Sequence, residues 1–125
     1  MASTIWLAAA AILMSQSQAA SAPSTLQAAG YLSSGELYDF CSAVPGDADY
    51  ENRMLHCGSY LEGASDATSA ILGAQGRRIY CLPDGTPVRR LREPFLAYVR
   101  AHPESRDYQA ASTVFVVLIQ SYPCP

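Results

Sequence analysis

The chain has 125 residues, half of them hydrophobic, and a formal net charge of −3. This length accommodates a single domain with its own core. The eight basic residues are all arginines and are interspersed with eleven acidic residues, so the composition provides no basic surface for a nucleic acid. We therefore expect one small globular domain that does not bind nucleic acid.

Residues 1–20 are predicted to form an export signal. Residues 5–14 are an apolar run without charge, and small residues follow it as candidate cleavage positions. The run is too short for a permanent membrane anchor, and its place at the start of the chain disfavours the alternative of a buried N-terminal helix. We expect cleavage after Ala19 or Ala20, a linker over residues 21–30, and no membrane association after cleavage.

The domain, predicted over residues 31–125, contains four cysteines. An even count in a small exported protein indicates two disulfides formed in an oxidising compartment. The spacing of the cysteines does not fit a zinc site. Three pairings are open. We favour Cys41 with Cys57, which joins two adjacent predicted helices, and Cys81 with Cys124, which ties the C-terminus to the turn before the third helix.

Hydrophobic periodicity and helix breakers predict an all-α domain of about four helices. Ser33 and Glu36 have the spacing of a capping box at the start of the first helix, and Thr86 followed by Pro87 predicts the start of the third. Pro94 falls inside the third helix, which it should kink or distort. The predicted helices cover residues 33–43, 50–72, 87–102 and 107–122.

The same periodicity predicts which face of each helix is buried. Asp47 or Asp49 is expected to cap the second helix. Gly58 and Gly63 weaken its helix propensity, so we interpret them as places where another backbone packs closely. The predicted apolar faces are Leu37, Phe40, Cys41 and Val44; Met54, Cys57, Leu61, Ala64, Thr68 and Ile71; Val88, Leu91, Phe95, Leu96 and Val99; and Ala111, Val114, Phe115, Leu118, Ile119 and Tyr122.

The connection over residues 73–80 is predicted to be the most exposed and adaptable segment. It ends in Arg77, Arg78, Ile79 and Tyr80. Arginine and tyrosine are enriched at protein–protein interfaces, so we predict that these four residues contact a partner. The chain has eight tyrosines, and we expect most of the others at the edge of the core.

No group of residues in the sequence predicts catalysis. His56 adjoins Cys57, but consecutive helical residues point in different directions, and a cystine is not a nucleophile. Glu62 and Asp66 share a helical face, yet no third ligand completes a metal site. His102 suits the C-terminal end of a helix. We therefore predict a protein without enzymatic activity, cofactor or metal.

Six blocks of sequence carry a resemblance to a known family. In order they are Leu32–Cys41, Cys57–Ala67, Cys81–Gly85, Ala101–Glu104, Ala110–Ala111 and Tyr122–Cys124. Together with the four cysteines and the export signal, they resemble the Rap/Tai-type family of type VI secretion amidase immunity proteins.

The resemblance implies a small, all-helical, periplasmic protein, often a homodimer, that binds an incoming cell-wall amidase toxin and blocks its catalytic cleft. The resemblance assigns no contact residues, because the cysteines, glycines and prolines of the shared blocks have structural roles. Two alternative functions remain open. One is a general periplasmic stress or chaperone-like helical protein that exposes apolar surface in acid. The other is an enzyme that uses Glu62, Asp66 or His102.

Overall fold

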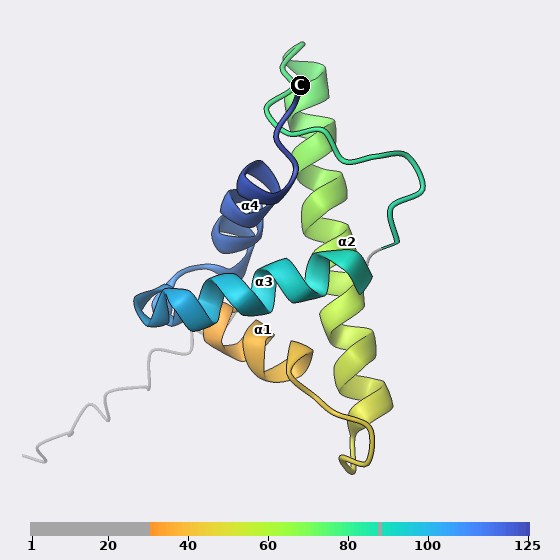
Figure 1. Cartoon of the computed structure of the whole chain (residues 1–125), viewed down its shortest axis with the longest axis vertical. Helices are drawn as coiled ribbons and strands as arrows, with labels where there is room; N and C mark the ends of the chain where they lie inside the picture. Colours follow the sequence, from red (N-terminus) through yellow and green to blue (C-terminus); the bar gives the residue numbers. More distant parts are fainter. Residues whose placement is uncertain (1–30, 88) are drawn as a thin grey trace, which may run out of the picture.

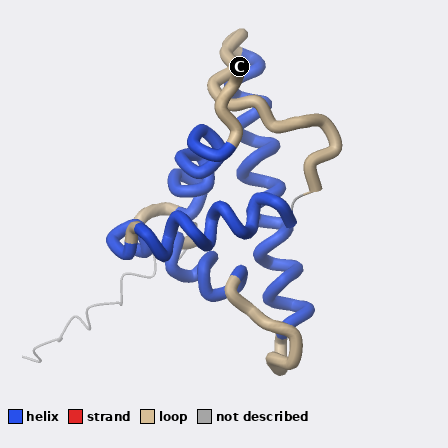
Figure 2. Tube along the Cα trace, in the orientation of Figure 1, coloured by secondary structure: helices blue, strands red, loops and turns tan. Residues whose placement is uncertain are grey.

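The computed structural model describes residues 31–87 and 89–125. The predicted export signal (1–20), the linker (21–30) and Val88 lie outside the described residues. The helices are α1 Ser34–Cys41, α2 Tyr50–Ala74, α3 Arg89–Ala101, the 3-10 helix η1 Pro103–Asp107, and α4 Ala110–Ser121. Apart from an isolated bridge between Ser33 and Gln109, the described residues contain no strand, so the all-α prediction is confirmed (Figure 2).

The helix α2 runs along the longest axis of the molecule, and α3 crosses it (Figure 1). The helices α1 and α4 lie on opposite sides of α3, and each contacts both α2 and α3. With 25 residues, α2 is about 38 Å long. Only Cys57, Leu61 and Ser65 of α2 are buried. Both ends of this helix therefore present surface that the rest of the domain does not cover.

Both favoured disulfide pairings are confirmed. Cys41–Cys57 joins α1 to α2, and Cys81–Cys124 joins the α2–α3 connection to the C-terminal segment. Their sequence separations of 16 and 43 residues correspond to about 3 and about 4 kcal/mol in the chain-entropy model. The hydrophobic core of the domain, which includes the first disulfide, is formed by Leu37, Cys41, Cys57, Leu61, Tyr80, Leu91, Phe95, Leu96, Val99, Ala110, Val114 and Leu118.

The capping box of α1 is confirmed, because the Ser33 side chain accepts from the Glu36 amide and the Glu36 side chain accepts from the Ser33 amide. The helix ends at Cys41, earlier than predicted. Arg92 of α3 contacts the last residue of this helix and the chain after it, because its Nε donates to the carbonyl of Cys41 (2.7 Å) and its Nη2 to that of Ala43 (3.1 Å). Val44 is 56% exposed, so its predicted place on the buried face is wrong.

Two helix starts differ from the prediction. Asp49 occupies the N-cap position of α2, but its side chain makes no capping bond. The carboxylate of Asp47 instead accepts from an amide of the preceding loop at 3.0 Å. Helix α3 begins at Arg89, and the hydroxyl of Thr86 donates to the carbonyl of Pro83 at 2.6 Å. The hydroxyl of Thr86 thus takes part in a local turn, and Val88, between Thr86 and the start of α3, lies outside the described residues.

Helix α3 continues through Pro94. The missing N–H of this proline leaves the carbonyl of Arg90 without its intrahelical partner. The hydroxyl of Tyr122 lies 3.5 Å from that carbonyl, at the long limit for a hydrogen bond. The predicted apolar face of α3 is confirmed for its described members, because the buried residues are Leu91, Phe95, Leu96 and Val99.

The interpretation of Gly58 and Gly63 is wrong. A Cβ atom added at either position would meet no atom within 4 Å, so no other backbone packs there. The close approach occurs at Gly35 of α1, where an added Cβ would lie 3.2 Å from the carbonyl oxygen of Arg106 in η1. The absence of a side chain at Gly35 thus allows η1 to pack on α1.

Helix α4 is present but begins later and faces the core differently from the prediction. Its buried residues are Ala110, Thr113, Val114, Val117 and Leu118. Ala111, predicted to be buried, is exposed, and three other predicted members are half-buried: Phe115, Ile119 and Tyr122. The hydroxyl of Ser34 in α1 donates to the hydroxyl of Thr113 at 2.7 Å in the interior, which fixes this face toward α1.

Candidate partner-binding site

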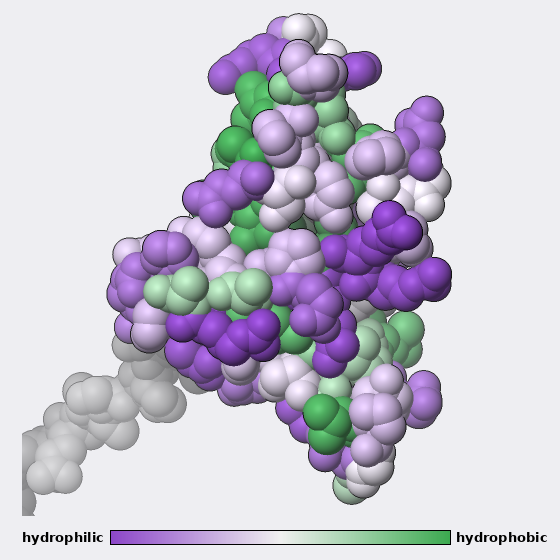
Figure 3. Space-filling model, viewed as in Figure 1, coloured by the Kyte–Doolittle hydropathy of each residue, from purple (hydrophilic) through white to green (hydrophobic). Residues whose placement is uncertain are grey.

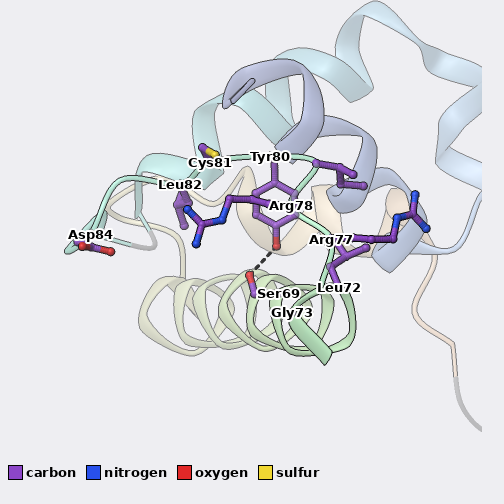
Figure 4. Close-up of a pocket in the computed structure, with 10 residues that line it drawn as sticks. Ser69, Leu72, Gly73, Arg77, Arg78, Tyr80, Cys81, Leu82 and Asp84 are labelled. Carbon is purple, nitrogen blue, oxygen red and sulfur yellow. Dashed lines mark hydrogen bonds between the residues drawn. The ribbon is translucent and has the colours of Figure 1, made fainter. Parts of the chain in front are cut away.

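The C-terminal end of α2 and the connection that follows it enclose an open groove of about 290 Å³ (Figure 4). Four members of the lining are the residues that the sequence predicted to contact a partner. The full lining is Ser69, Leu72, Gly73, Arg77, Arg78, Ile79, Tyr80, Cys81, Leu82 and Asp84. The structure therefore brings the predicted contact segment together with the last two turns of α2 and the turn around Asp84.

The four predicted contact residues do not play the same part in this groove. Arg77 and Arg78 are exposed, Ile79 is half-buried, and Tyr80 is only 6% exposed. The hydroxyl of Tyr80 donates to the carbonyl of Ser65 (3.1 Å) and lies 2.7 Å from the hydroxyl of Ser69; the contact with Ser69 is the dashed line in Figure 4. Tyr80 therefore anchors the connection to α2, and the arginines provide its accessible polar groups.

The backbone before the arginines is fixed by the end of α2. Gly76 has a φ of 64°, a left-handed conformation that favours glycine. The amide of Gly76 donates to the carbonyl of Gly73 at 3.0 Å, and that of Arg77 to the carbonyl of Leu72 at 2.9 Å. This is the Schellman arrangement, which satisfies carbonyls that the helix end leaves unpaired. Arg77 thus follows α2 in a defined direction.

The backbone after the arginines is held by the C-terminal segment. The amide of Cys81 donates to the carbonyl of Tyr122 at 2.8 Å, and the side chain of Cys81 forms the disulfide with Cys124. Residues 73–78 of the connection are exposed, as predicted, but the arginine pair is attached on both sides. The sequence predicted the disulfide, but it gave no signal for the backbone bond to Tyr122, which lies about forty positions away.

A second groove, of about 310 Å³ and lined mainly by apolar groups, lies between α2 and α4. Its residues are Thr68, Ile71, Leu72, Ala111, Ser112 and Phe115. Leu72 lines both grooves, so they lie next to each other at the end of α2. Ile71 is 61% exposed, which contradicts its predicted place on the buried face.

One sequence signal for this second surface was missed. No charged residue occurs between Asp66 and Arg77, although most residues of that stretch are exposed. A helical end with an uncharged, exposed surface is typical of an interaction site when it adjoins a groove.

The charges of the groove are not neutralised within the described part of the chain. Among those residues, four carboxylate contacts with a basic side chain lie within 4.0 Å, three to arginine and one to His102, and none includes Arg77, Arg78 or Asp84. The pairs are Asp47–Arg53, Glu93–Arg92, Glu104–His102 and Asp39–Arg106. The two arginines of the groove therefore remain accessible to a group on a partner.

The shifted pKa values belong to other parts of the domain. Hydrogen bonds from the amide and hydroxyl of Ser33 lower the pKa of Glu36 in the capping box of α1. Burial raises the pKa of Tyr60, against a smaller opposing effect of a hydrogen bond with the backbone of Ala111. Glu36 and Tyr60 line neither of the two grooves, and their shifts have capping and burial as their causes.

The residues considered for catalysis are not assembled. His56 packs against Phe40 with ring centroids 5.2 Å apart, while its neighbour Cys57 is in a disulfide. Glu62 and Asp66 are exposed on α2. His102 pairs with Glu104 at the surface, at 3.3 Å. Within residues 31–87 and 89–125, no group of three or more His, Cys, Asp or Glu side chains could hold a metal ion.

The described residues thus form a small helical domain, held by two disulfides, with a groove whose two arginines make no ion pair with another described residue. In the described part of the chain, no helix combines the length and apolarity needed to cross a membrane. A comparison with protein families matches residues 33–124 to the Rap1a immunity proteins. The match covers most of the chain, which therefore belongs to this family of proteins that act against a toxin effector. No curated protein and no solved structure matches the chain.

Proposed function

We propose that this protein binds a peptidoglycan amidase delivered by type VI secretion and inhibits it in the periplasm by covering its catalytic cleft. Membership of the Rap1a immunity family is the observation that carries the proposal. The amidase as target follows the sequence resemblance described above. The two disulfides support an oxidising compartment such as the periplasm.

The inhibition we propose is steric. The end of α2 and the connection after it lie at one extremity of the molecule (Figure 1). Both grooves meet there, and the stretch between Asp66 and Arg77 is uncharged and mostly exposed. A projecting end of this kind can enter a cleft and exclude a peptide substrate from it. No catalytic group of the inhibitor is required, which agrees with a family that is typically not enzymatic.

The surface of the domain supports this choice of contact region. Figure 3 shows that hydrophilic residues cover much of α3 and its surroundings on the visible face, while hydrophobic residues appear beside the upper part of α2. Protein interfaces commonly combine an apolar centre with a polar rim. The apolar groove beside Ile71 and the arginines of the other groove provide these two components side by side.

The test is inhibition of an amidase encoded beside this gene. The oxidised, exported protein is titrated into the amidase, and hydrolysis of muropeptides is followed. We expect a tight complex, with activity falling to a stoichiometric end point. A protein that neither binds nor inhibits any neighbouring amidase would contradict the proposal. In that case, reversible binding of an apolar dye in acid would support the stress-protein alternative.

A further inference from the structure

We infer that Arg78 recognises an acidic side chain of the toxin by a two-pronged guanidinium–carboxylate contact in the groove. The inference rests on the proposed function and specifies the chemistry of its contact surface. Four observations lead to it: the local charge, the direction of the side chain, its attachment, and the lack of an ion-pair partner among residues 31–87 and 89–125.

The chain is acidic overall, but the segment that begins in the groove and runs into α3 is basic. Residues 77–90 contain four of the eight basic residues and one of the eleven acidic residues, which gives this segment a formal charge of +3 in a chain of −3. All four arginines of the segment are exposed. Whole-chain composition concealed this asymmetry. A local field of this sign attracts acidic groups and speeds their approach.

Arg78 is the arginine of this segment that is best placed to contact an acidic group in the groove. In Figure 4 its side chain extends toward Leu82, across the part of the groove that Ser69 and Tyr80 line, whereas Arg77 extends the other way. Asp84 lines the same groove but makes no ion pair with Arg78 within 4.0 Å. The groove therefore offers a carboxylate both a guanidinium and enclosing walls.

The attachment of the backbone makes Arg78 an effective contact. It follows Arg77, whose amide is bonded to Leu72, and it precedes Tyr80, which is buried and hydrogen-bonded to α2. A side chain on an ordered backbone loses less conformational freedom when it binds. The planar guanidinium can also donate two parallel hydrogen bonds to one carboxylate, which lysine cannot do.

A purely structural role for Arg78 makes a different prediction. A cation just beyond the end of α2 interacts favourably with the helix dipole, and the last turn of α2 contains no basic residue. That role depends on charge alone, so Arg78→Lys should preserve it. Recognition of a carboxylate by the fork should be weakened by the same substitution. The two roles are therefore separable.

The experiment measures affinity and association rate between the oxidised protein and the toxin at low and high salt. We expect Arg78→Lys to weaken binding by about tenfold and Arg78→Glu by on the order of a hundredfold. Arg78→Glu should also reduce the salt dependence of the association rate. The matched control is Arg100→Glu, which makes the same charge change on an exposed arginine in the last turn of α3 and should alter affinity by less than about threefold.

The outcomes distinguish this inference from the proposed function. If the wild-type protein inhibits the toxin and the variants of Arg78 bind as tightly as the Arg100→Glu control, the inference is overturned and the proposed function stands. If the wild-type protein does not bind the toxin, both fail. Binding of an acidic muropeptide by the protein alone, lost in Arg78→Glu, would assign the groove to the cell-wall substrate and also overturn the inference.

Discussion

Replacing Tyr80 with phenylalanine removes a single hydroxyl group from the wall of the groove. In the wild-type protein this hydroxyl donates to the carbonyl of Ser65 at 3.1 Å and lies 2.7 Å from the hydroxyl of Ser69. The ring is buried, at 6% exposure, and phenylalanine keeps its packing. The substitution therefore isolates the two polar contacts that attach the connection to α2.

The expected loss of stability follows from these contacts. A hydrogen bond between neutral groups contributes about 0.5–1.5 kcal/mol net. Ser69 is exposed, so its hydroxyl can turn to water once Tyr80 loses its oxygen. We therefore expect Tyr80→Phe to lower the free energy of unfolding by about 1–2 kcal/mol. In a domain of this size, that corresponds to a fall in Tm of roughly 5–10 °C.

The assay is urea unfolding of the oxidised protein, followed by circular dichroism, in a double-mutant cycle with Ser69→Ala. If the two hydroxyls interact, the cycle should give a coupling free energy of about 1 kcal/mol. Tyr108→Phe provides the matched control, because Tyr108 is 53% exposed and its change should cost less than about 0.5 kcal/mol. Additive effects of the two single changes, or equal losses for Tyr80→Phe and Tyr108→Phe, would refute the anchoring role.

Three further predictions concern the scaffold. Arg92→Met removes two hydrogen bonds to the carbonyls of Cys41 and Ala43 at the end of α1, and should lower the free energy of unfolding in urea by about 2 kcal/mol. A loss no larger than that of Arg100→Met would show that these bonds do not stabilise the domain. Gly58→Ala should stabilise the domain by up to about 1 kcal/mol, because its methyl group meets open space in a helix, whereas Gly35→Ala should destabilise it by pushing against η1. The opposite order of melting temperatures would contradict this packing. Glu36 has a lowered pKa, so its contribution to stability is present at neutral pH and is lost as pH falls through the folded pKa. The stability difference between wild type and Glu36→Gln should therefore shrink on acidification, and a difference independent of pH would oppose this view of the capping box.

Local signals in the sequence predicted a large part of this fold. The spacing of Ser33 and Glu36 located the start of α1, because a capping box depends only on residues three positions apart. The face of α3 was correct because its apolar and charged residues are clearly separated. Both disulfide pairings were predicted correctly, because the elements that they join were expected to lie next to each other.

The errors arose where tertiary contacts decide between local alternatives. Helix α4 is apolar on most sides, so periodicity determined its rotation poorly. The buried hydrogen bond between Ser34 and Thr113 selects the observed face, and neither residue signals this contact in the sequence.

The candidate site was predictable as a segment but not as a surface. The composition of residues 77–80 indicated a contact region, and the groove does include them. The sequence did not show that Tyr80 faces inward, since this depends on its distance from Ser65 and Ser69 in the folded chain. It also gave no indication that Ile71 and Phe115, from different helices, share a second groove.

Hydrogen exchange of this protein, alone and in complex with the amidase toxin, would locate the surface that contacts the toxin. We expect binding to slow exchange over residues 69–84, which contain the end of α2 and the arginine segment. A rival surface lies at the other end of α2, where Val44 and Leu55 are 56% and 67% exposed. Protection confined to residues 42–56, with exchange in residues 69–84 unchanged, would show that the toxin binds the other end of α2 and not the grooves.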